Sequence, residues 1–142
     1  MNHPRSDHST LVLLRYAWAF PATIVGLTVA LVALLAGATL NRIEGALEVG
    51  GGRIAFLVSL LPRRLQFAAI TLGHVIVGLD PAVLRRVRSH EHVHVRQYER
   101  WGVLFFPLYV GSSVAQLLNG RDPYRNNRFE REAFAVDECD EA

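Results

Sequence analysis

Five consecutive residues of this 142-residue chain, His90 to His94, have the spacing that binds zinc on one face of a helix. They read His-Glu-His-Val-His and fit the pattern HExxH. An α-helix turns by about 100° per residue, so His90 and His94 lie one turn apart on the same face, where both can reach one ion. Glu91 is their neighbour around the helix, and its carboxylate would accept a proton from a water bound to that ion. The alternative is an amphipathic helix that carries these histidines by chance.

A catalytic zinc needs three protein ligands and one open position, so the two histidines require a partner. The only cysteine, Cys139, lies in the acidic C-terminal tail, which excludes a cysteine-based zinc site. A third histidine six residues after His94 is excluded because Arg100 occupies that place. The candidates are Glu130 and Glu132, each followed three residues later by alanine. Residues two apart on a helix diverge by about 200°, so only one of them can readily face the ion.

The motif must be held by a helix, and the residues before it are typical of a helix start. Asp80 is a good N-cap and Pro81 a good first helical residue, which predicts a helix from Pro81 to about Trp101. Residues 128 to 136 predict a second, short helix that carries both glutamates. These two helices would form the core of the site.

The sequence between residues 43 and 80 predicts a few strands. Two apolar runs flank Gly50-Gly51-Gly52, and the second covers Arg53 to Leu60, which is typical of a hairpin or a loose strand pair. Phe67 to Leu79 is rich in β-branched residues and predicts a strand whose His74 points to one face; a second membrane segment is the alternative there. The expected fold is therefore α+β, in a domain that covers residues 43 to 137 and precedes an acidic tail at 138 to 142.

Two uncharged segments predict contact with a membrane. Residues 17 to 40 would span about 36 Å as a helix, enough to cross a bilayer. We therefore expect a retained transmembrane helix after a polar segment of residues 1 to 16, and a secretory signal cleaved near residues 36 to 38 is the alternative. Residues 102 to 118 are short for a full span. We expect a membrane-associated helix there, with a buried core helix as the alternative.

All 15 basic residues are arginine, and the net charge is only +2. No continuous basic tract indicates nucleic acid, so the expected partners are the lipid bilayer and a peptide or protein substrate. Arginines are abundant around the motif, which favours a cytoplasmic active site on a bacterial-type cytoplasmic membrane.

HExxH followed at a distance by Glu-x-x-Ala, in a chain with membrane segments, resembles the gluzincin metallopeptidases. It is most similar to the integral-membrane zinc peptidases related to the CAAX prenyl proteases, over about residues 80 to 137. The resemblance implies a zincin-like domain, Zn²⁺ held by His90, His94 and Glu130, and Glu91 as the general base of peptide hydrolysis. Those peptidases usually have Asp after the alanine, whereas this chain has Phe134, and Asp137 either replaces that residue or has no such role.

Two further residues are candidates to contact the substrate or its oxyanion, His74 and Tyr124. The alternative function is a non-catalytic membrane scaffold or regulator that keeps a structural metal site on a peptidase-like fold. The small size of the chain favours that alternative, because little material is left for substrate subsites.

Overall fold

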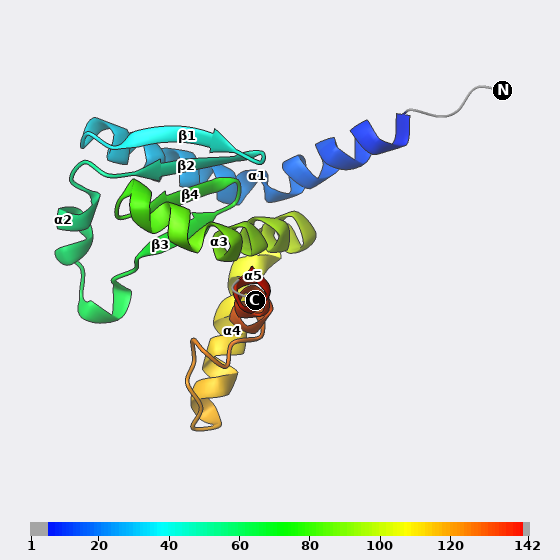
Figure 1. The fold of residues 1–142 in the computed structure, drawn as a ribbon. Helices are drawn as coiled ribbons and strands as arrows, with labels where there is room; N and C mark the ends of the chain where they lie inside the picture. Colours follow the sequence, from blue (N-terminus) through cyan, green and yellow to red (C-terminus); the bar gives the residue numbers. More distant parts are fainter. Residues whose placement is uncertain (1–5, 141–142) are drawn as a thin grey trace.

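The computed structural model describes residues 6–140, which form helices around one four-stranded sheet (Figure 1). The expected α+β fold with an N-terminal apolar helix is confirmed. The first five residues of the polar segment and the last two of the acidic tail lie outside the described residues. In chain order the elements are α1 (Ser6–Leu35), β1 (Thr39–Ile43), β2 (Ala46–Gly50), α2 (Ile54–Ser59), η1 (Arg63–Leu65), β3 (Ala69–Leu72), β4 (Val75–Gly78), α3 (Pro81–Trp101), η2 (Gly102–Leu104), α4 (Phe105–Leu118) and α5 (Arg128–Asp140).

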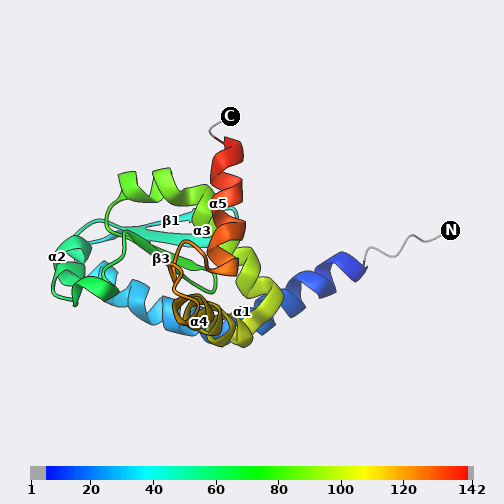
Figure 2. The ribbon, with the colours of Figure 1, turned by 90° about the horizontal axis from the view of Figure 1, so that it is seen from below.

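The sheet has the strand order β1-β2-β4-β3. β1 and β2 are antiparallel, β3 and β4 are antiparallel, and β2 and β4 pair in parallel with Leu47 opposite Val75. Figure 2 shows the sheet between α1 on one side and α3 on the other. All four residues of β4 are buried, as expected for a central strand covered on both faces. β3 is an edge strand, and it runs next to the helix that carries the HExxH motif.

The structure corrects two of the expected strands. Residues 67–79 are not one strand, nor a membrane segment, because they form the two strands β3 and β4 joined by a turn at Gly73 and His74. The apolar run expected as a strand after Gly52 is the short helix α2. Its Ile54 and Val58 are one helical turn apart, and both are buried in the same core cluster. A short apolar run does not by itself distinguish a strand from a helix.

The predicted motif helix is confirmed, from Pro81 to Trp101. The Asp80 side chain accepts hydrogen bonds from the backbone N–H groups of Ala82 and Val83, at 2.7 and 2.8 Å, as an N-cap does. The helix ends at Gly102, whose φ is +54°, and a Cβ added there would come within 2.5 Å of the Trp18 ring. Glycine therefore allows both the change of direction and the close approach of α1.

Helix α1 differs from the expected span of residues 17 to 40, because it ends at Leu35 and Leu40 belongs to β1. Its buried residues are small and form a stripe that faces the sheet and α3: Ala19, Gly26, Ala30 and Ala33. A Cβ added at Gly26 would lie 2.5 Å from the carbonyl oxygen of Leu72. From Ala19 to Ala33 the helix is thus packed against the body of the protein, while large apolar residues of the same segment point outward.

The expected helix of residues 102 to 118 is present as η2 and α4, and the alternative of a buried core helix is wrong. Phe105 is the only buried residue of α4. By length and composition alone, two helical segments are apolar enough to cross a membrane, Tyr16–Leu35 and the continuous stretch Pro81–Leu118, whose uncharged part is α4.

Candidate metal centre

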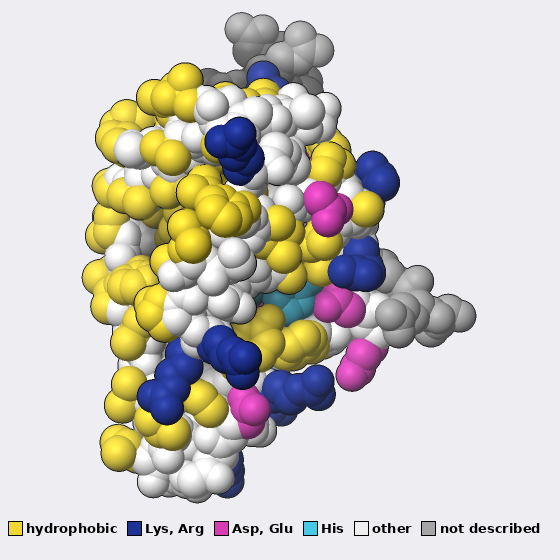
Figure 3. Space-filling view, turned by 90° about the vertical axis from the view of Figure 1, so that its left-hand side faces the viewer, with side chains coloured by type: hydrophobic (Ala, Val, Ile, Leu, Met, Phe, Trp, Pro, Cys, Tyr) yellow, Lys and Arg dark blue, Asp and Glu magenta, His cyan; other side chains and the backbone are white. Residues whose placement is uncertain are grey.

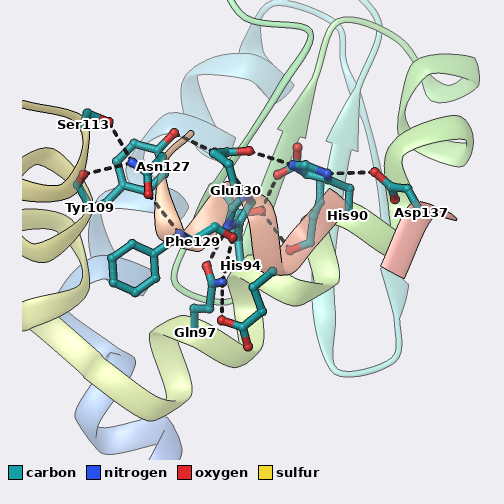
Figure 4. Close-up of polar contacts among 12 residues, drawn as sticks. His90, His94, Gln97, Tyr109, Ser113, Asn127, Phe129, Glu130 and Asp137 are labelled. Atoms are coloured by element: carbon teal, nitrogen blue, oxygen red, sulfur yellow. Dashed lines mark hydrogen bonds and ion pairs between the residues drawn. The ribbon is translucent and has the colours of Figure 1, made fainter. Parts of the chain in front are cut away.

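Three buried side chains from two helices converge on one point. His90 and His94 extend from α3 and Glu130 extends from α5, and one potential ligand atom of each lies within 4.8 Å of the others. The distance is 3.1 Å from His90 Nε2 to Glu130 Oε2 and 3.4 Å from His94 Nε2 to Glu130 Oε1. Figure 4 shows the two imidazoles and the carboxylate pointing toward one another. This group could hold a metal ion.

The structure separates the two candidate glutamates. Glu130 is buried, whereas the Glu132 side chain is 46 % exposed and points to the other side of α5. There Glu132 accepts a hydrogen bond from Gln97 Nε2 at 3.0 Å and lies 3.6 Å from Arg100. Side chains two residues apart on a helix point in directions that differ by about 200°. In α5, Glu130 is the one that points toward the histidines. The preference for Glu130 is therefore the one that fits this geometry.

A second layer of polar side chains orients the two imidazoles. Nδ1 of His90 lies 2.9 Å from Asp137 Oδ2, and Nδ1 of His94 lies 2.8 Å from Gln97 Oε1. With Nδ1–H donating to these oxygens, each ring would present the lone pair of Nε2 to a metal ion bound in place of the proton shared with Glu130. Gln97 is held in turn by its amide, which donates to the carbonyl oxygen of Phe129 at 3.0 Å. The site thus has the supporting contacts of a metal centre in addition to the potential ligands.

Comparison with known proteins does not assign the chain. No family model, no curated protein and no solved structure matches it. The chemistry of its own residues is therefore what supports a function.

The start of α5 is fixed by Asn127, which is fully buried. Its amide donates to the carbonyl oxygen of Tyr109 at 3.0 Å and to Ser113 Oγ at 2.7 Å, while its own Oδ1 accepts from the N–H of Phe129 at 2.9 Å. These bonds join the first turn of α5 to α4 (Figure 4). Tyr109 also donates its phenol proton to Glu130 Oε1, at 2.6 Å. Helix α4 therefore positions the carboxylate that faces the histidines.

Glu91 lies beside the two histidines in the same cleft and is buried. The hydroxyl of Thr71, on the edge strand β3, donates to Glu91 Oε2 at 2.7 Å. The cleft lies between β3, α3 and α4, and Figure 3 shows a histidine side chain in a hollow flanked by hydrophobic side chains. Its other lining residues are mostly apolar: Phe67, Ala69, Ile70, Leu72, Tyr98, Phe105, Phe106, Tyr109 and Tyr124.

The charges of the centre are coupled. Burial disfavours the charged imidazolium, but hydrogen bonds to Glu130 and Asp137 outweigh it and raise the pKa of His90 from 6.5 to about 9. Burial likewise disfavours the Glu130 carboxylate, but hydrogen bonds from His90 and His94 outweigh it and lower its pKa from 4.5 to about 2. The centre thus favours a positive charge on His90 beside the negative charge of Glu130.

Only one of the two candidate substrate-contacting residues lies in the cleft. Tyr124 lines the cleft, as expected of such a contact. His74 does not, because its ring stacks on Tyr16 with 4.2 Å between centroids and its nitrogens lie 3.3 Å from Thr23 Oγ1 and 3.2 Å from Glu99 Oε1. From the turn between β3 and β4 it therefore joins α1 to α3.

Two residues of the site were not predicted from the sequence, Thr71 and Tyr109. Thr71 is one of several β-branched residues in its strand, and Tyr109 lies in an apolar run that has the composition of a membrane segment. Nothing in the spacing of either residue relates it to the HExxH motif. Only the packing of β3 and α4 around α3 brings them to the centre.

Proposed function

We propose that this protein is a membrane-associated zinc-dependent peptidase of the gluzincin type. The observation that carries the proposal is the convergence of His90, His94 and Glu130 beside the buried carboxylate of Glu91. Two imidazoles, one carboxylate and a neighbouring glutamate are the groups that metal-assisted peptide hydrolysis needs. Their common opening to a cleft supports a catalytic rather than a closed structural centre, because a structural zinc usually has four protein ligands.

The donor set favours zinc as the metal. Two neutral imidazoles and one carboxylate form the ligand set of hydrolytic zinc enzymes, in which the fourth position stays open. Bound there, zinc would lower the pKa of a bound water toward about 7 and polarise the substrate carbonyl.

The residues around the metal each have a role in this proposal. Glu91 accepts the proton of the attacking water through Oε1, because Thr71 holds Oε2, and then returns that proton to the leaving amine. Partial burial raises the pKa of Tyr124, so its phenol keeps its proton at neutral pH. Tyr124 can thus donate a hydrogen bond to the oxyanion of the substrate.

The lining of the cleft indicates the kind of substrate. Phe106 contributes to the cleft and is also 64 % exposed on α4, so the cleft continues into the apolar surface of that helix. The peptide or protein substrate is therefore expected close to the membrane.

The substitution Glu91→Gln tests the proposal. It keeps the volume and polarity of the side chain but removes the base, so hydrolysis should fall by about 10²–10⁴-fold while zinc content stays unchanged. Cleavage of fluorescently labelled, unfolded casein and the zinc content of the purified full-length protein are the two measurements. Glu138→Gln, on the exposed side of α5, is the matched control and should keep full activity.

Two results would contradict the peptidase. One is a purified protein that binds no stoichiometric zinc, and the other is unchanged casein cleavage by the Glu91→Gln protein. Zinc binding without cleavage by the unmodified protein would instead support the non-catalytic scaffold or regulator.

A further inference from the structure

An apolar surface formed by α1 and α4 lies outside the metal centre, on one side of the molecule. We term it the apolar face and define it by five exposed side chains: Leu27 and Leu31 of α1, and Phe106, Val110 and Leu117 of α4. In Figure 2 both helices lie along the lower edge of the molecule. Figure 3 shows hydrophobic side chains gathered toward the left of the view and acidic side chains toward the right. Exposed apolar surface on two neighbouring helices indicates a contact with a protein or a membrane.

The packing of α1 is incompatible with a free transmembrane helix. Within its apolar segment, Tyr16–Leu35, Ala19 near the start is buried with Tyr98 and Phe105, and Ala33 near the end is buried with Val49 of β2. If α1 crossed a bilayer, the sheet that lies along it would enter the hydrocarbon together with its edge strand β1. An open sheet edge does not occur in lipid, because its backbone N–H and C=O groups have no partner there.

The directions of the two helices lead to the same conclusion. In Figure 1, α1 runs across the page and α4 runs down it. In Figure 2, α1 is seen lengthwise and α4 end-on. The two axes therefore cannot both follow the bilayer normal, whereas both can lie in one plane parallel to the membrane surface, as interfacial helices do.

We propose that the protein binds one leaflet of an anionic bilayer through the apolar face, with α1 and α4 lying in the plane of the membrane. This placement replaces the transmembrane helix expected for residues 17 to 40, and it does not depend on peptidase activity.

Charged and aromatic groups fit this placement. Arg121 and Arg125 follow α4, are exposed, and form no ion pair with the residues that the structure describes. Their guanidinium groups can therefore bind lipid phosphates. Trp18 on α1 is 48 % exposed, and tryptophan is common at the membrane–water interface. The C-terminal end of α5 lies on the opposite side of the molecule, which would face water, and the exposed Cys139 belongs to this end of the helix.

Fluorophore depth measurements on the full-length protein test the proposal. In a Cys139→Ser background, single cysteines are introduced by Phe20→Cys, Leu27→Cys and Leu35→Cys, and each is labelled with a fluorophore. The proteins are bound to vesicles of phosphatidylcholine and phosphatidylglycerol, and depth is measured by quenching with lipids that carry nitroxides at different positions. Unchanged circular dichroism and zinc content verify that each labelled protein is folded.

An α1 in the membrane plane places all three labels at the same depth within a few Å. Phe20 and Leu35 are about 22 Å apart along the helix, so a spanning α1 would place the Leu27 label deep and the other two toward opposite surfaces, which would overturn the proposal. Absence of vesicle binding would overturn it as well. A label on the native Cys139 should stay unquenched in water.

Two further results check the other parts of the proposal. Labels at Phe106→Cys and Leu117→Cys on α4 should lie at the same depth in the bilayer, as measured by the same quenching experiment. Binding should be weaker to vesicles of phosphatidylcholine alone, and equal binding to both kinds of vesicle would contradict the role given to the arginines. Loss of casein cleavage in the Glu91→Gln protein has no bearing on these depths, so the two proposals fail separately.

Discussion

Asp137 Oδ2 lies 2.9 Å from His90 Nδ1, on the side of the imidazole that faces away from Glu130. Both carboxylates come from α5, seven residues apart, which is two turns of a helix and hence the same face. One helix therefore supplies both a potential ligand and the group that orients a second one. Phe134, one turn after Glu130, packs edge-on against the same imidazole with 5.0 Å between ring centroids. The imidazole of His90 thus has an aromatic contact from Phe134 and a carboxylate contact from Asp137, one turn further along α5.

Substitution of this carboxylate should weaken metal binding. In Asp137→Asn the amide still reaches His90 Nδ1 but carries no charge, so the imidazole becomes a poorer ligand and zinc affinity should fall by about 10–100-fold. Competition with a chromophoric chelator measures the affinity. Glu138→Gln is the control, because that side chain is exposed and one residue further along α5. Equal affinities of the Asp137→Asn and unmodified proteins would show that the 2.9 Å contact does not support the metal.

The two glutamates of α5 should differ in their effect on zinc stoichiometry. Glu130→Gln removes the carboxylate that lies 3.1 Å from His90 and should abolish stoichiometric zinc after dialysis. Glu132→Gln removes only the contacts to Gln97 and Arg100 and should retain one zinc per chain. Elemental analysis of the dialysed proteins is the measurement. The reverse pattern, with zinc lost only in Glu132→Gln, would contradict the arrangement of α5.

Zinc binding should release protons at neutral pH. The pKa of His90 in the metal-free protein is raised to about 9, so at pH 7 the ring is protonated and must lose its proton to bind a metal. Apparent affinity should therefore increase as pH rises from 7 and level off near pH 9, by about tenfold for each pH unit if one proton is released. Calorimetric titrations in two buffers of different ionisation enthalpy count the protons. Affinity that stays constant between pH 7 and 9 would contradict this coupling.

Asn127 should be important for the stability of α5. Asn127→Ala removes a helix cap and leaves buried partners without hydrogen bonds, so the free energy of unfolding should fall by about 1–3 kcal/mol. Urea unfolding followed by circular dichroism measures the change. Asn126→Ala is a matched control, since its side chain is exposed. Similar losses in both variants would mean that the loop as a whole, and not the buried cap, stabilises α5.

The sequence predicted the local features of the site correctly because they depend on neighbouring residues. The helix from Pro81 to Trp101 follows from a capping aspartate and a proline, and the spacing of His90 and His94 places them on one side of that helix. The sequence did not distinguish α2 from a strand, because a run of six apolar or small residues fits either period. It also merged β3 and β4, whose turn at Gly73 and His74 is held by contacts with Thr23 of α1 and Leu47 of β2.

The helical period determined that only one of Glu130 and Glu132 could face the histidines. It could not determine which face of α5 packs against α3. That face is decided by contacts of high sequence separation, in which Asn127 joins α5 to α4 and Gln97 of α3 binds the backbone of Phe129. The apolar composition of residues 17 to 40 likewise indicated a membrane contact. Only the tertiary structure placed α1 along the sheet, because the alanines and Gly26 that face the core allow an approach so close that no lipid fits between them.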